Sequence, residues 1–126
     1  MERVERSRDV PDKMKIIAET LLLDELKQMT ACGFGDMVKA VVDVERELVA
    51  VDAELHSDLE ALLLENGSKQ KSLWGINLYP EVPQDEFVEF DSMINMRPSR
   101  GNRSRGVEDE ETRKKIVSIV AKRISR

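Results

Sequence analysis

Four arginines stand close together between residues 97 and 105, and no acidic residue interrupts them. Arginine side chains bind phosphate and carboxylate groups through planar forks of N–H donors. The segment leads into a predicted helix, whose free N-terminal N–H groups favour anions. We therefore regard residues 97–105, called the arginine loop, as a candidate anion-binding site. Its candidate residues are Arg97, Arg100, Asn102, Arg103, Ser104 and Arg105, with Asn77 and Asn95 on neighbouring predicted strands.

A cluster of acidic residues, 108–111, follows the arginine loop directly. These carboxylates could pair with the arginines and with the helix dipole, inside one chain or between subunits. The sequence leaves both interpretations open, an anion site and a salt-bridge network.

A polar strip could continue the arginine loop along the sheet. Asn77 and Tyr79 alternate with apolar residues on one predicted strand, and Asn95 and Arg97 do so on the next. If the two strands pair, the four side chains share one face and could form the floor of a pocket. The alternative is a solvated face of an antiparallel sheet, which is the common arrangement.

His56 is the only histidine and therefore the natural acid–base candidate. Asp52, Glu54, His56 and Asp58 alternate, so an extended chain would place all four on one side. A helix beginning at Ser57 or Asp58 would break that alternation. The pattern therefore favours capping and surface charge over a metal site, and we expect neither a metal nor a cofactor.

Several enzyme classes lack their motifs in this chain. There is no glycine-rich phosphate loop, G-x-S-x-G elbow, C-x-x-C, H-E-x-x-H or dinucleotide fingerprint. The sequence leaves open whether the protein is an enzyme.

The charge distribution indicates what the protein could bind. The formal net charge is −5, which disfavours a broad nucleic-acid surface. Because the arginine loop carries +4, the rest of the chain carries −9. We expect a small protein-interaction module able to form homodimers, in which the loop meets an acidic surface such as residues 52–58 of another copy. The alternative is a binder of a phosphorylated small molecule or short RNA, with catalysis through His56 as a variant.

The cysteine content, the N-terminal segment and the short apolar runs indicate a cytoplasmic protein with one domain. Cys32 is the only cysteine, so no internal disulfide can form, and the residue is predicted to fill the core. Residues 1–13 are predicted to be a disordered tail and residues 14–126 a single domain. The longest apolar runs, such as 21–23, are far too short to cross a membrane.

Hydrophobic periodicity predicts the order β-α-β-β-α-β-β-α. The predicted strands are 14–19, 38–44, 48–51, 73–79 and 87–97, and the predicted helices are 20–33, 57–66 and 108–126. In the last strand, Ile94 and Met96 are predicted to face the core, and Asn95 the opposite side. These elements predict an α+β fold with a mostly antiparallel sheet of about five strands and three helices on one face.

Five stretches of the chain resemble a small prokaryotic family of unknown function. They are Glu54–His56, Leu62–Ser68, Leu73–Pro80, Phe90–Pro98 and Gly101–Glu108, and the likeness runs from about Met14 to the end. The resemblance implies a bacterial or archaeal source and assigns no functional residue.

Overall fold

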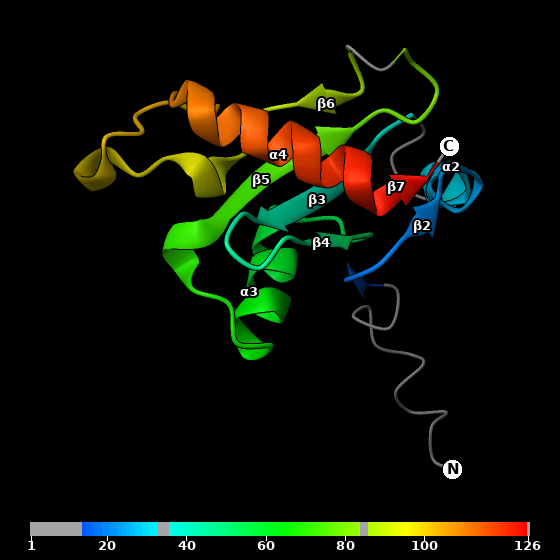
Figure 1. The fold of residues 1–126 in the computed structure, drawn as a ribbon, viewed down its shortest axis with the longest axis horizontal. Helices are drawn as coiled ribbons and strands as arrows, with labels where there is room; N and C mark the ends of the chain where they lie inside the picture. The colour runs from blue at the N-terminus through cyan, green and yellow to red at the C-terminus, as the bar shows by residue number, and fades with distance from the viewer. Residues whose placement is uncertain (1–13, 33–35, 84–85, 126) are drawn as a thin grey trace.

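The computed structural model describes residues 14–32, 36–83 and 86–125 (Figure 1). Five strands form one antiparallel sheet in the order β1-β4-β3-β5-β6, while β2 and β7 form a separate parallel pair. The strands are β1 (Lys15–Ile17), β2 (Leu21–Leu22), β3 (Val38–Asp43), β4 (Leu48–Val51), β5 (Leu73–Leu78), β6 (Val88–Glu89) and β7 (Ile124–Ser125). The helices are α2 (Leu23–Cys32), α3 (His56–Glu65) and α4 (Glu110–Arg123). The predicted α+β class is confirmed, and the predicted tail 1–13 lies outside the described residues.

Helices cover both faces of the sheet, which corrects the prediction of a single helical layer. Helices α2 and α4 contribute Leu26 and Ile116 to the larger hydrophobic core, and α4 crosses the sheet in Figure 1. Helix α3 contributes Leu59 and Leu63 to a smaller core. The two clusters divide the residues of β3 between them, because that strand is buried on both faces.

The predicted hairpin of β3 and β4 is confirmed, and Asp43 organises its turn. Its Oδ1 accepts hydrogen bonds from the backbone N–H groups of Glu45 and Arg46, at 2.9 and 3.0 Å. Lys122 of α4 then binds the Glu47 carboxylate in the same turn, at 2.6 Å. The turn therefore also anchors the C-terminal helix.

Two predicted helix starts are wrong. Thr20 does not cap α2, because residues 21–22 first pair with β7 and the helix begins at Leu23. Helix α3 begins at His56, and its N-cap residue Leu55 makes no side-chain cap hydrogen bond. By contrast, Asp109 caps α4 by accepting from the Thr112 N–H at 2.9 Å, within the predicted acidic start.

The long strand predicted over 87–97 is also wrong. Strand β6 covers only Val88–Glu89, and 3₁₀ turns follow at Met93–Asn95 and Pro98–Arg100. Ser92 begins the first turn, because its hydroxyl oxygen accepts from the Ile94 N–H at 3.3 Å. The turn reverses the predicted burial: Asn95 is fully buried and Met96 is exposed.

Candidate functional site

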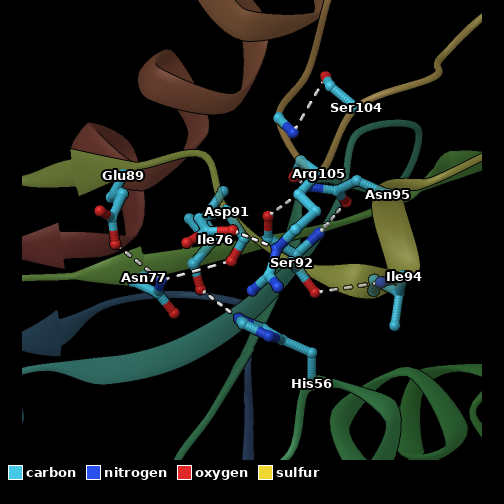
Figure 2. Close-up of polar contacts among 12 residues, drawn as sticks. His56, Ile76, Asn77, Glu89, Asp91, Ser92, Ile94, Asn95, Ser104 and Arg105 are labelled. Atoms are coloured by element: carbon cyan, nitrogen blue, oxygen red, sulfur yellow. Dashed lines mark hydrogen bonds and ion pairs between the residues drawn. The ribbon is translucent and has the colours of Figure 1, made fainter.

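The side chain of Asn95 takes the place of a strand beside β5. Its Oδ1 accepts from the Gly75 N–H at 2.8 Å, and its Nδ2 donates to the Gly75 carbonyl at 3.0 Å and to the Arg105 carbonyl at 2.8 Å (Figure 2). A residue in a hydrogen-bonded antiparallel pair exchanges the same two bonds with its partner. The side-chain amide thus provides hydrogen-bond partners for the backbone N–H and C=O of β5 beyond the end of β6.

A second buried asparagine closes the loop that follows. Asn102 Nδ2 lies 2.7 Å from the Asn95 carbonyl oxygen and 2.8 Å from that of Gly106, and Asn102 Oδ1 accepts from the Glu108 N–H at 2.8 Å. The backbones of Asn102 and Arg97 also exchange two hydrogen bonds, at 2.7 and 3.1 Å. We call residues 92–108 the clamped loop, because two buried amides hold its turns together.

Gly75 allows the clamped loop and α3 to approach the sheet. A Cβ atom at this position would lie 2.5 Å from Ser92 Oγ and 3.2 Å from His56 Cδ2. The first distance is shorter than any ordinary contact, and Ser92 is itself buried. Any side chain at Gly75 would therefore displace the start of the loop.

The four arginines of the loop do not converge on one point. Arg97 is half-buried, donates to the carbonyls of Leu73 and Ile94, and lies over the Trp74 ring with its guanidinium carbon 4.7 Å from the centroid. Burial lowers the pKa of Arg97. Arg105 donates through Nε to Asp91 Oδ1 at 2.6 Å.

The other two arginines are exposed. The guanidinium groups of Arg100 and Arg103 make no hydrogen bond or ion pair with the described residues. The backbone N–H groups of Arg103 and Ser104 both donate to Glu108 Oε2, each at 2.8 Å. These bonds lower the pKa of Glu108. A carboxylate of the chain thus occupies the backbone donors that an external anion would use.

A polar cluster, made up of His56, Asn77, Glu89, Asp91 and Arg105, lies on the α3 side of β5 (Figure 2). Asn77 Nδ2 donates to Glu89 Oε1 at 2.9 Å and reaches the Asp91 carbonyl at 3.4 Å. Both neighbours are acceptors, so the amide orientation is fixed. Within the described part of the chain, Asn77 Oδ1 is buried without a hydrogen-bond partner. Tyr79 also donates to Glu89, at 2.8 Å, which raises the pKa of Tyr79 to about 12.

The predicted polar strip is therefore split. Asn77 and Tyr79 bind the carboxylate of Glu89, whereas Asn95 and Arg97 bind backbone groups of β5. Because Asn77 and Asn95 are buried, the strip is not an open pocket floor.

His56 is buried in the polar cluster and holds α3 against β5. Its Nε2 lies 2.8 Å from the Ile76 carbonyl oxygen, which makes Nε2 the protonated nitrogen of the neutral ring. Burial lowers the pKa of His56, and the Ile76 carbonyl, the Asn77 side chain and the Asp91 carboxylate oppose that shift only in part. The alternating acidic residues around His56 are split by the helix start, and no metal-binding group of three His, Cys, Asp or Glu occurs in the described ranges.

The clamped loop also forms one wall of a groove that the sequence did not indicate. The groove has a volume of about 430 Å³ and lies between this loop, α3 and the turn before β5. We call it the basic groove; it is lined by Glu60, Gln70, Lys71, Met93, Ile94, Met96, Arg97, Pro98, Ser99 and Arg100. Met93 and Met96 are 63% and 42% exposed. Sequence alternation assigned Met96 to the core, and only the turn geometry places it here.

The structure thus separates the predicted site residues into four groups. His56, Asn77 and Arg105 meet in the polar cluster with Asp91, which the sequence analysis did not select. Arg97 and Arg100 line the basic groove. The amides of Asn95 and Asn102 are used inside the loop, and Arg103 and Ser104 bind Glu108.

The buried His56 predicts how stability depends on pH. Because its pKa is lowered in the folded state, the unfolded chain binds the proton more readily. The contribution of neutral His56 to the free energy of unfolding is fully present above its pKa in the unfolded chain, about 6.5. It is lost as the pH falls through the pKa of His56 in the folded protein. We expect the free energy of unfolding in urea to fall between about pH 7.5 and 5.5, by at most about 1.4 kcal/mol per pH unit.

The control for this prediction is His56→Gln, whose amide can still donate to the Ile76 carbonyl but does not titrate. The pH-dependent loss should vanish in this variant. A wild-type protein with constant stability over this range, or a variant with the same slope, would contradict the assignment.

Comparison with known proteins gives a family but no activity. The sequence matches the family described as "Protein of unknown function (DUF5674)" over residues 15–123. No curated protein and no solved structure matches the chain significantly. In the described ranges, no helix is long and apolar enough to cross a membrane. Since the match spans the five-stranded sheet, the polar cluster, the clamped loop and all of α4, the chain belongs to this family of unknown function.

Proposed function

We propose that this protein is a small interaction module that binds an acidic, partly apolar segment of a protein partner in the basic groove. One observation carries the proposal. The clamped loop buries the polar side chain of Asn95 completely and exposes the large apolar side chains of Met93 and Met96 on either side of it. This reverses the usual burial preference of asparagine and methionine.

Exposed methionines fit a surface that contacts other proteins. Methionine is flexible and polarisable, so its side chain adapts to irregular partners. Methionine and arginine are both enriched in protein interfaces relative to the remaining surface. Here Arg97 is held over Trp74 beside the methionines, which gives the groove a fixed cationic wall.

The charges of the groove indicate an acidic partner. Lys71, Arg97 and Arg100 contribute three positive charges, and Glu60 contributes the one carboxylate of the lining. Gln70 already donates to Glu60, at 3.3 Å. An acidic segment would thus gain electrostatic attraction, which mainly accelerates association and aids specificity.

We propose the cytoplasm as the compartment. With a single cysteine the chain cannot form an internal disulfide, and disulfide-free domains suit a reducing environment.

A second candidate function is anion binding in the polar cluster. Arg105 uses Nε to bind Asp91, and its two Nη atoms make no hydrogen bond within the described ranges. Figure 2 shows Arg105 and His56 on the same side of β5. Guanidinium N–H groups beside a buried histidine would suit a phosphate group. This arrangement supports the phosphorylated small molecule that the arginine loop suggested.

The basic groove is tested with a labelled helical peptide of glutamate, leucine and alanine, about 15 residues long. We expect fluorescence anisotropy to show binding that weakens with salt, because charges contribute to it. Arg100→Glu should weaken binding about tenfold by reversing a lining charge. Arg103→Glu is the matched control, because Arg103 is an exposed loop arginine outside the groove. Equal loss in both variants, or no binding to the wild type, would refute the proposal.

The anion site is tested by thermal unfolding with inorganic phosphate and with AMP. A ligand present at about 100 times its Kd stabilises the folded protein by about 2.7 kcal/mol, so the melting temperature must rise. Arg105→Gln should abolish the rise, whereas Arg103→Gln should keep it. If neither phosphate nor AMP shifts the wild type, this second function is rejected.

A further inference from the structure

Besides the basic groove, α3 carries a second surface on which large apolar side chains are exposed. Leu55 and Leu64 are 56% and 41% exposed. With Met93 and Met96 they make four of the six large hydrophobic side chains exposed in the described part of the chain. All four lie on or next to α3, so the exposed apolar side chains concentrate on one side of the molecule.

The outer side of α3 is acidic. Residues three and four apart share a face of a helix, which places Ala61, Leu64 and Glu65 together on the exposed side. Glu54 and Asp58 flank the helix start and are also exposed. We call this surface the acidic face; it consists of Glu54, Leu55, Asp58, Ala61, Leu64 and Glu65.

The acidic face complements the basic groove in both charge and chemistry. It offers three carboxylates beside two leucines, and the groove offers Lys71, Arg97 and Arg100 beside two methionines. The acidic face is therefore the kind of segment that the groove is proposed to bind. One molecule cannot bring them together, because both surfaces are built on the same helix: Glu60 of α3 lines the groove while Glu65 points outward.

We infer that the partner is a second copy of this chain, in a symmetric dimer in which the acidic face of each copy fills the basic groove of the other. This inference rests on the proposed function of the groove. A two-fold axis beside α3 uses both surfaces of both copies at once, and the assembly then closes at two. Each contact occurs twice, which doubles the buried surface.

Sedimentation velocity tests the dimer over a range of protein concentrations at low salt and at about 0.5 M salt. We expect a dimer that dissociates on dilution and more readily at high salt. Arg100→Glu and Glu65→Lys should each weaken it about a hundredfold, because a roughly tenfold loss per contact occurs twice. Glu65 is near the C-terminal end of α3, where a lysine suits the helix dipole, so that variant should remain folded.

Mixing the two variants gives the decisive result. In a heterodimer, the glutamate introduced by Arg100→Glu in one copy meets the lysine introduced by Glu65→Lys in the other, and the unaltered pair meets at the second contact. An equimolar mixture should therefore restore dimers that neither variant forms alone. The controls Arg103→Glu and Glu111→Lys, which alter exposed charges outside both surfaces, should behave as the wild type.

Three results would overturn the inference. If the wild type stays monomeric, the dimer inference is wrong. The acidic-peptide experiment then tests the groove by itself: if the peptide binds, the proposed function stands with another partner. If the peptide does not bind either, both proposals fail. A dimer that is insensitive to Arg100→Glu and Glu65→Lys forms through a different surface.

Discussion

The pairing of one side-chain amide with the backbone of Gly75 determines the architecture around the candidate sites. Strand β5 continues past the end of β6, so its edge would present unpaired N–H and C=O groups inside the protein. An unsatisfied buried backbone group costs about 1–3 kcal/mol. Asn95, which is itself fully buried, removes that cost because its side chain makes two hydrogen bonds with the backbone of Gly75. Strand β6 can therefore end early while the backbone of β5 at Gly75 still has hydrogen-bond partners.

The surface of the loop follows from this burial. Because Asn95 points inward from a short 3₁₀ turn, Met93 and Met96 must point outward, and they become the apolar part of the basic groove. Asn102 fixes the return of the chain by binding the Asn95 carbonyl. The segment from Asp91 to Arg105 also places these two residues in the polar cluster, next to His56. One anchoring residue thus positions both candidate sites.

The sequence predicted the fold better than it predicted the sites. The hairpin of β3 and β4, the capped start of α4 and the antiparallel sheet were visible from hydrophobic alternation and acidic first-turn residues. Alternation failed at residues 90–97, because it assumes that backbone groups pair with backbone groups. A side chain that replaces a strand leaves no periodic signal, so Asn95 and Met96 were assigned to the wrong sides. The burial of both faces of β3 was likewise visible only in the packing of α3.

Hydrogen exchange at the Gly75 amide tests the role of Asn95 most directly. This N–H donates to Asn95 Oδ1 on the β6 side of the strand. Successive backbone N–H groups of a strand point to opposite sides, so the Ile76 N–H points toward β3, with which both residues pair. In Asn95→Ala we expect the Gly75 amide to lose most of its protection from exchange while the Ile76 amide keeps its own. Asn95→Asp retains an acceptor and should protect Gly75 more than alanine does. Unchanged protection at Gly75 in Asn95→Ala would contradict the claim that this side chain completes the sheet.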